Sequence, residues 1–130
     1  MEVYETSIAW IRYLHSQNIK TAVVSSSRNC EAVLKAADIT DLFEARVDGK
    51  VAASLGIAGK PAPDTYLKAA QMLSVEPKRC VVVEDAISGV QAGRAGEFGL
   101  VIGVNRNDDA EALINNGADI IVADLGEMLK

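Results

Sequence analysis

Two adjacent carboxylates, Glu84 and Asp85, stand where a short apolar run ends. The run, residues 80–83, is too short for a helix and rich in β-branched residues, which is typical of a strand buried on both faces. Ligands of parallel sheets bind at the carboxyl ends of the strands, so this pair is placed for metal binding or proton transfer. The structural alternative is that Glu84 caps a turn and Asp85 is the N-cap of the following helix.

Two other segments carry side chains that could bind an anion. Residues 25–29, Ser-Ser-Ser-Arg-Asn, follow an expected strand at 21–24. Hydroxyl groups beside the free N–H groups of a helix start form an anion cradle, and at minimum an N-cap. Lys60 lies in Gly-Lys-Pro-Ala-Pro-Asp, residues 59–64, where two prolines stiffen the backbone around its ammonium group. The structural alternative for Lys60 is an exposed lysine in a proline turn.

The hydrophobic pattern predicts strands that alternate with helices. Strands are expected at 21–24, in the second half of 42–47, and at 80–83, 100–104 and 120–122. The first helix is capped by Thr6 or Ser7, ends at Asn18, and has the inner face Ile8, Ile11, Leu14 and Ile19. Further helices are expected from 30 to 37, from Pro63 to Leu73, at 87–95 and at 110–115, with a last helical turn at 125–129. Asp48-Gly49 predicts a turn, and 51–59 has no clear pattern.

This alternation predicts one α/β domain over residues 1–130. The fold class is a Rossmann-like parallel sheet with helices on both faces and right-handed connections. The acidic side chains number 18 and the basic ones 13, for a net charge of −5, and no cluster of lysine and arginine is present, so nucleic acid is not an expected partner.

Export and membrane insertion are not expected either. The acidic N-terminus lacks the pattern of a signal peptide, and no apolar run approaches the ~18 residues of a membrane span. Cys30 and Cys80 form no Cys-x-x-Cys pair, so we interpret both as reduced packing residues, the first on a helix face and the second at the start of a strand. The single histidine, His15, is given no role. These features predict a soluble cytoplasmic protein.

Three segments, taken in order, resemble the haloacid dehalogenase superfamily of phosphoryl-transfer enzymes, and in detail its β-phosphoglucomutase-like branch. They are AVVSSSRN at 22–29, GKPAPD at 59–64 and VEDAISGVQAG at 83–93. A serine after a strand is a weak signal by itself, whereas the three segments together are a strong one. The resemblance extends over nearly the whole chain.

The resemblance implies a phosphate-binding set. Ser25 matches the hydroxyl that hydrogen-bonds the transferring phosphoryl group, with Ser26 beside it, and Lys60 matches the lysine that neutralises the phosphoryl oxygens and the nucleophile. Such groups suit the reaction because the charge spreads over the phosphoryl oxygens and catalysis is largely positioning and electrostatic stabilisation. Arg28 and Asn29 match positions where relatives contact substrate, although a basic residue at a helix start is commonly just solvated.

The resemblance also implies Mg²⁺ as the cofactor. Asp85 matches the carboxylate that binds the ion, and Glu84 stands beside it as an outer or water-mediated ligand. Magnesium prefers oxygen ligands and keeps several waters, so a few carboxylates suffice.

One family feature is absent from the sequence. The family begins with Asp-x-Asp on its first strand, whose first aspartate is the nucleophile, and here no two aspartates are separated by one residue. The helical cap domain that selects the substrate is also missing, so the chain looks like the C-terminal part of such an enzyme.

The absence of the first strand has a structural consequence. In the family this strand, which carries Asp-x-Asp, lies between the strands that precede Ser25 and Asp85. Either these two strands pair directly, or another polypeptide fills the gap, because buried backbone groups rarely stay unpaired.

The main hypothesis is a haloacid dehalogenase-like domain related to sugar-phosphate phosphatases and phosphomutases, inactive or incomplete by itself because the nucleophile is absent. A sugar phosphate would be the ligand of the completed enzyme. The alternative is a non-catalytic interaction or regulatory module, or one subunit of a split hydrolase, completed by a partner strand or a second copy. A phosphate-accepting receiver-type domain is disfavoured, since no acidic pair follows the first strand. The main hypothesis requires Ser25, Lys60 and Asp85 to gather at one edge of the sheet.

Overall fold

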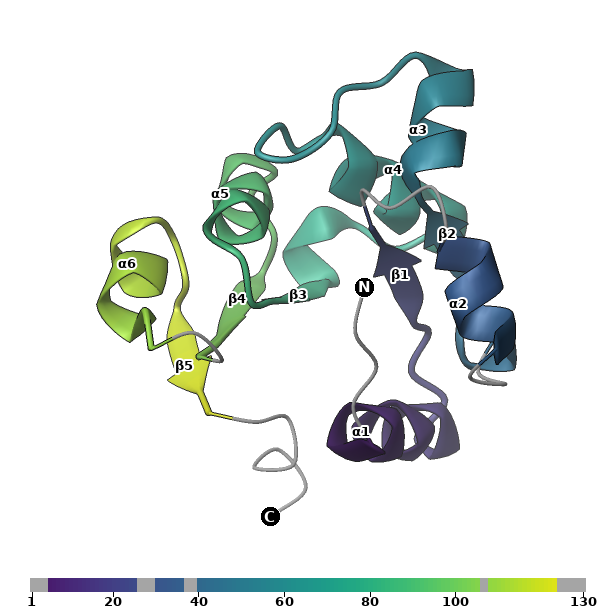
Figure 1. Cartoon of the computed structure of the whole chain (residues 1–130), viewed down its shortest axis with the longest axis horizontal. Coiled ribbons are helices and arrows are strands. Elements are labelled where there is room, and N and C mark those ends of the chain that lie inside the picture. Colours follow the sequence, from purple (N-terminus) through teal and green to yellow (C-terminus); the bar gives the residue numbers. More distant parts are fainter. Residues whose placement is uncertain (1–4, 26–29, 37–39, 106–107, 124–130) are drawn as a thin grey trace.

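The computed structural model describes residues 5–25, 30–36, 40–105 and 108–123. Strands and helices alternate along this part of the chain (Figure 1). The strands are β1 (Ala22–Val24), β2 (Ala45–Val47), β3 (Val81–Glu84), β4 (Leu100–Val104) and β5 (Ile120–Val122). The α-helices are α1 (Glu5–Ser16), α2 (Cys30–Ala36), α3 (Gly49–Leu55), α4 (Asp64–Leu73), α5 (Ile87–Ala95) and α6 (Ala110–Asn115). Two short 3₁₀ helices are η1 (Thr40–Leu42) and η2 (Pro77–Arg79).

Within the described ranges, the strands form two parallel sheets rather than one. β1 pairs with β2, and the second sheet has the order β3-β4-β5. Every pairing is parallel, as predicted. No ladder joins β1 to β3 in the described part of the chain, so direct pairing of these two strands is not the arrangement adopted.

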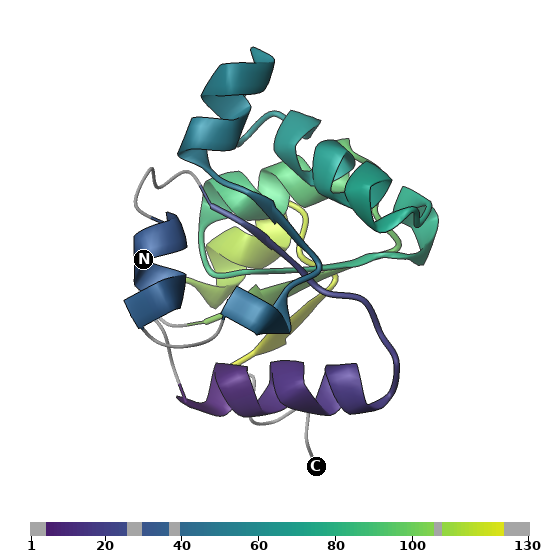
Figure 2. The same cartoon turned by 90° about the vertical axis from the view of Figure 1, so that its right-hand side faces the viewer.

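Helices cover both faces of the strands, which confirms the predicted α/β class. On one face α4 packs against β1 and β2, and α5 packs against β3 and β4. α1 lies on the opposite face (Figures 1 and 2). Ile8 and Ile11 of α1 pack on the buried cluster of Cys30, Leu34 and Leu42, whereas Trp10 packs on the cluster around Ile102. α1 therefore contacts the cores beside both sheets.

The first helix differs from its prediction at both ends. Thr6 and Ser7 lie inside α1 rather than at its cap, and α1 ends at Ser16 rather than at Asn18. Asn18 has a φ of 60°, in the left-handed region that commonly follows a helix. The Ile19 N–H then bonds back to Leu14 O at 3.0 Å, which closes the turn. Ile19 is therefore outside the helix and 48% exposed, so its assignment to the inner face is wrong.

The segment without a clear pattern contains a helix. Asp48 is the N-cap of α3, because its Oδ1 accepts the Val51 N–H at 2.9 Å, and Gly56 ends the helix in a left-handed conformation. The predicted turn at Asp48-Gly49 is thus a helix start. In α4, Pro63 is the N-cap rather than the first helical residue.

Both cysteines are free thiols, as predicted. Cys30 is buried in α2, whereas Cys80 follows η2 and precedes β3, so it does not open the strand. The Cys80 thiol donates to Glu76 O at 3.4 Å. The predicted last turn at 125–129, and the helical position 37, lie outside the described residues. In the described ranges, no helix is both long and apolar enough to cross a bilayer.

Candidate functional site

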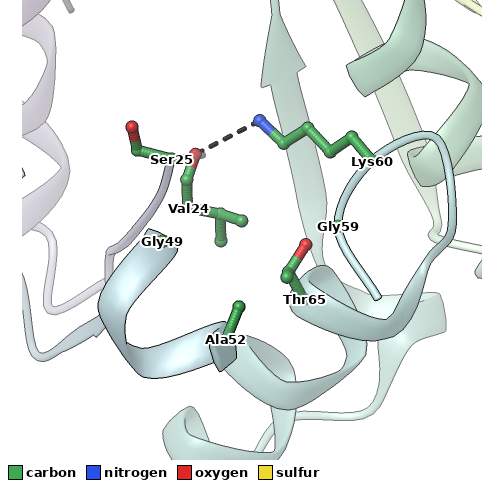
Figure 3. A pocket seen from close by; sticks show the side chains of 7 residues that line it. All are labelled: Val24, Ser25, Gly49, Ala52, Gly59, Lys60 and Thr65. Carbon is green, nitrogen blue, oxygen red and sulfur yellow. Dashed lines mark hydrogen bonds between the residues drawn. The ribbon is translucent and has the colours of Figure 1, made fainter. Parts of the chain in front are cut away.

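Lys60 joins the carboxyl ends of two strands that belong to different sheets. Its Nζ donates to the carbonyl oxygen of Val24, at the end of β1, at 3.2 Å (Figure 3). The same Nζ donates to Glu84 Oε2, at the end of β3, at 2.7 Å. The two charged side chains are 14% and 11% exposed, respectively. Because Lys60 is this well buried, the alternative of an exposed lysine in a proline turn is wrong.

The loop between α3 and α4 carries Lys60 to this position. The Ala62 N–H donates to Gly59 O at 3.1 Å and closes a turn around the lysine. Pro63 then begins the transition into α4, which packs on β1 and β2. These contacts fix the start and the end of the turn that carries Lys60.

The Glu84 carboxylate accepts hydrogen bonds from side chains and from the backbone. Oε2 accepts from Lys60, and Oε1 accepts the N–H groups of Asp85 at 3.2 Å and Ala86 at 3.3 Å. Burial raises the pKa of Glu84, but the charge of Lys60 and the hydrogen bonds outweigh burial and leave the pKa below its ordinary value. Glu84 therefore caps the turn after β3, as the structural alternative proposed. The N-cap of α5 is Ala86, without a side-chain hydrogen bond, so the N-cap interpretation of Asp85 is wrong.

Tyr66 is a member of this cluster that the sequence did not single out. Its hydroxyl donates to Glu84 Oε2 at 2.6 Å, and its ring centroid lies 5.0 Å from Lys60 Nζ. Burial, and then the charge of Glu84, raise the pKa of Tyr66, which keeps the hydroxyl protonated as a donor. The sequence placed Tyr66 only within the helix expected from Pro63 to Leu73. A tyrosine among buried apolar residues needs a hydrogen-bond partner for its hydroxyl, and this need is the sequence signal that could have identified Tyr66.

A hollow of about 130 Å³ lies beside Lys60. Figure 3 shows Ser25, Lys60 and Thr65 around it, contributed by the end of β1, the α3–α4 loop and the start of α4. Glycine and apolar side chains make up the rest of the lining: Val24, Gly49, Ala52 and Gly59. Thr65 is 5% exposed, and its Oγ1 has no hydrogen-bond partner among the described residues. Thr65 lies in none of the sequence segments that predicted a site.

The predicted site residues divide into two groups. Ser25 and Lys60 line the same hollow, and Lys60 contacts Glu84, which precedes Asp85 in the chain. Ser25, Lys60 and Glu84 therefore lie at the carboxyl ends of β1 and β3, and Asp85 is the first residue after β3. Ser26, Arg28 and Asn29 lie outside the described residues.

The donor groups fit a magnesium ion only in part. Within the described residues, no three His, Cys, Asp or Glu side chains are grouped as a metal site. Glu84 is committed to Lys60, Tyr66 and the backbone, so Asp85 is the carboxylate that the predicted pair offers as a ligand. A single carboxylate fits an ion that keeps several waters, but it does not complete a site.

Parallel strands with polar groups gathered at their carboxyl ends define an open α/β protein with its ligand site at that edge. The sequence profile of haloacid dehalogenase-like hydrolases matches residues 1–97. The chain belongs to this family of hydrolases, which confirms the resemblance inferred from the three segments.

Individual relatives place the chain near sugar-phosphate enzymes. It is 43% identical to a β-phosphoglucomutase of Mycobacterium bovis over 98% of this chain and 50% of the relative. It is 36% identical to a trehalose-phosphate phosphatase of Mycobacterium leprae over 96% of this chain and 28% of the relative. The crystal structure of a haloacid dehalogenase family hydrolase from Deinococcus radiodurans, with bound phosphate and sodium, superimposes with a TM-score of 0.84 at 32% identity, covering 96% of this chain and 56% of that one. The chain thus spans half or less of the length of these two sequence relatives.

Proposed function

We propose that this chain supplies the phosphoryl-binding edge of a haloacid dehalogenase-like enzyme that acts on a sugar phosphate. The observation that carries the proposal is the position of Lys60, whose ammonium is held between the ends of β1 and β3 beside a hollow that Ser25 also lines. An ammonium and a hydroxyl at one strand edge suit the spread charge of a phosphoryl group. The bound phosphate of the Deinococcus radiodurans relative, and the sugar-phosphate enzymes among the sequence relatives, support the same substrate class.

In this proposal each residue has a separate task. Lys60 neutralises the phosphoryl oxygens, and Ser25 and Ser26 donate hydrogen bonds to them. Arg28 and Asn29 contact the rest of the substrate. Asp85 would hold Mg²⁺, which, when bound, neutralises charge on the phosphoryl group.

Catalysis by this chain alone is not expected. The sequence contains no Asp-x-Asp, so the aspartate that forms the aspartyl-phosphate in the family is absent. The chain should bind orthophosphate weakly without turning over a phosphomonoester.

Titration calorimetry with orthophosphate, with and without Mg²⁺, tests the proposal. We expect binding by the native chain that is lost in Lys60→Met and weakened in Ser25→Ala. Tyr13→Phe, at an exposed site on α1, is the control and should bind like the native chain. No binding by the native chain contradicts the phosphoryl-binding role. Mg²⁺-dependent turnover of a phosphomonoester by this chain alone, abolished in Asp85→Ala, contradicts the predicted inactivity.

The separation of the two sheets supports a second candidate, a subunit or module that a further strand completes. β1 and β3 each have a ladder partner on one side only in the described ranges. We propose that a parallel strand bearing Asp-x-Asp, supplied by another polypeptide, lies between them. Size-exclusion chromatography of the chain with and without a co-expressed Asp-x-Asp segment is the test. A stable complex with phosphatase activity is expected, whereas a lone monomer that ignores the segment contradicts this candidate.

A further inference from the structure

Lys60, Glu84 and Tyr66 form a polar cluster of three side chains at the ends of β1 and β3. Glu84 Oε2 accepts two hydrogen bonds, from Lys60 Nζ at 2.7 Å and from the Tyr66 hydroxyl at 2.6 Å. Tyr66 also places its ring 5.0 Å from Lys60 Nζ. The ammonium therefore has an acceptor and an aromatic face that both depend on where Tyr66 lies.

The ring of Tyr66 is itself fixed by packing. Tyr66 is 8% exposed and belongs to the buried cluster that contains Val82 and Val90. Phe98 meets its ring edge-on, with centroids 5.8 Å apart and an interplanar angle of 72°. A ring held in this way gives its hydroxyl one direction, and that direction is toward Glu84.

We propose that Tyr66 is a positioning residue, whose hydroxyl holds the Glu84 carboxylate in the orientation that keeps the Lys60 ammonium at the strand ends. Phenylalanine would fill the same space, so the hydroxyl rather than the ring performs this task. Without it, Glu84 Oε2 keeps one donor, and the carboxylate gains freedom to turn away from the lysine.

The Tyr66 hydroxyl also affects the cost of moving Lys60 away from Glu84, a point that rests on the proposed phosphoryl-binding role of Lys60. When Lys60 turns from Glu84 toward a phosphoryl oxygen, a buried carboxylate loses its cationic partner. A buried charge without hydrogen-bonding partners is costly. The hydroxyl of Tyr66 and the two backbone N–H groups at Oε1 remain as donors, so they lower the cost of releasing Lys60.

The exchange of the Lys60 ammonium protons with water tests the positioning role without any ligand. The full chain is labelled with ¹⁵N-lysine, and the Lys60 signal is assigned by its loss in Lys60→Arg. In Tyr66→Phe we expect exchange at least several-fold faster than in the native chain at the same pH. Tyr13→Phe removes the same atom at a site that is 49% exposed and should leave the exchange unchanged. Native-like exchange in Tyr66→Phe would overturn the proposal.

A packing control separates the hydroxyl from general loosening of the core. Phe98→Leu weakens the support of the same ring but leaves the hydroxyl in place. We expect it to lower the free energy of unfolding while the Lys60 protons exchange at nearly the native rate. If Phe98→Leu accelerates the exchange as much as Tyr66→Phe does, the effect comes from packing and the positioning role is contradicted.

Orthophosphate affinity shows whether Tyr66 acts through Glu84. We expect Tyr66→Phe to weaken binding about tenfold in the native background, as for the loss of one hydrogen bond to a charged group, and to have no further effect in Glu84→Gln. Additive effects contradict action through Glu84. If the native chain binds no orthophosphate, the proposed function fails, and the exchange measurement alone decides the role of Tyr66.

Discussion

Both side chains of the Lys60–Glu84 ion pair are mostly buried, and their burial determines how the loss of either one affects stability. At 2.7 Å the two charges compensate each other, and hydrogen bonds from Tyr66 and the backbone occupy the remaining acceptor positions of the carboxylate. Removing one partner leaves the other charge uncompensated in a poorly hydrated place, whereas removing both does not. The pair therefore matters to stability chiefly through the cost of breaking it.

We predict that Lys60→Met and Glu84→Gln each lower the free energy of unfolding by about 3 kcal/mol. The double variant should lose less than the sum of the two single losses, because no unpaired charge remains. Urea unfolding of the four proteins measures this cycle. Additive losses would show that the two side chains do not interact in solution.

The acid sensitivity of the fold should depend on Glu84. Its pKa in the folded chain lies below the unfolded value of about 4.3, so the folded state binds fewer protons than the unfolded state in that range. The stabilisation is complete above about pH 4.3 and is lost as the pH falls through the folded pKa. Stability measured from about pH 6 to about pH 3, with EDTA present, should fall less steeply in Glu84→Gln than in the native chain. Equal slopes would contradict this assignment.

Gly89 in α5 leaves the space that the Glu84 side chain occupies. A Cβ at this position would clash with the Cγ, Cδ and Oε2 atoms of Glu84. Alanine is favoured over glycine inside a helix by about 0.5–1 kcal/mol, so Gly89→Ala would stabilise the chain if nothing were in the way. We predict a net loss of stability and faster exchange of the Lys60 ammonium protons, because Glu84 must move. Tyr13→Phe, at an exposed site on α1, is the control for exchange.

At the scale of the element, α3 shows how one buried side chain starts a short helix. Asp48 is 1% exposed, and while its Oδ1 caps α3, its Oδ2 lies 3.0 Å from the Arg46 Nε of β2. A helix of seven residues has little intrinsic stability, so it depends on its cap and on packing. α3 also contributes Gly49 and Ala52 to the hollow beside Lys60, so the cap supports one wall of the candidate site.

We predict that Asp48→Ala lowers the free energy of unfolding by about 2 kcal/mol, since it removes a cap worth about 1 kcal/mol and also an ion pair. Asp48→Asn keeps a capping oxygen and should lose less. Circular dichroism during urea unfolding gives both values. Equal losses in the two variants would mean that the charge, not the cap, holds α3.

At the scale of the whole molecule, the two sheets are held together by helices and side chains rather than by a ladder. In the described part of the chain, the Lys60 ammonium contacts the ends of β1 and β3, and α1 packs on cores beside both sheets. β4 differs from β1 and β3 in its pairing, because it has a ladder partner on each side.

Amide hydrogen exchange should follow this division. We predict slow exchange in β4 and faster exchange in β1 and β3, which have one ladder partner each, because a backbone N–H without a partner exchanges readily. A co-expressed Asp-x-Asp strand that completes the sheet should slow exchange in β1 and β3 and leave β4 nearly unchanged. Protection of β1 and β3 equal to that of β4 in the chain alone would contradict the two-sheet arrangement.

The hydrophobic pattern of the chain was enough to predict the class of fold, and three short segments pointed to the candidate residues. Apolar runs such as 100–104 predict buried parallel strands, because a strand covered on both faces needs no polar alternation. The GKPAPD segment and the Glu84–Asp85 pair contain Lys60 and Glu84, which the fold brings into contact. These features are local, so the order of residues along the chain is enough to recognise them.

The partners of these side chains became known only from their positions in the folded chain. The contacts of Glu84 with Lys60 and Tyr66 join positions distant in the sequence, and so would a ladder between β1 and β3, which is absent in the described ranges. The space beside Gly89 is filled by Glu84 because of how α5 packs on β3. The end of α1 at Ser16 and the start of α3 at Gly49 were also missed, because neither the left-handed turn at Asn18 nor the capping bond of Asp48 shows in the hydrophobic pattern. The physical reason is the same in each case: a hydrogen bond or a packing contact depends on which groups meet in space, and the pattern of residue types does not specify those partners.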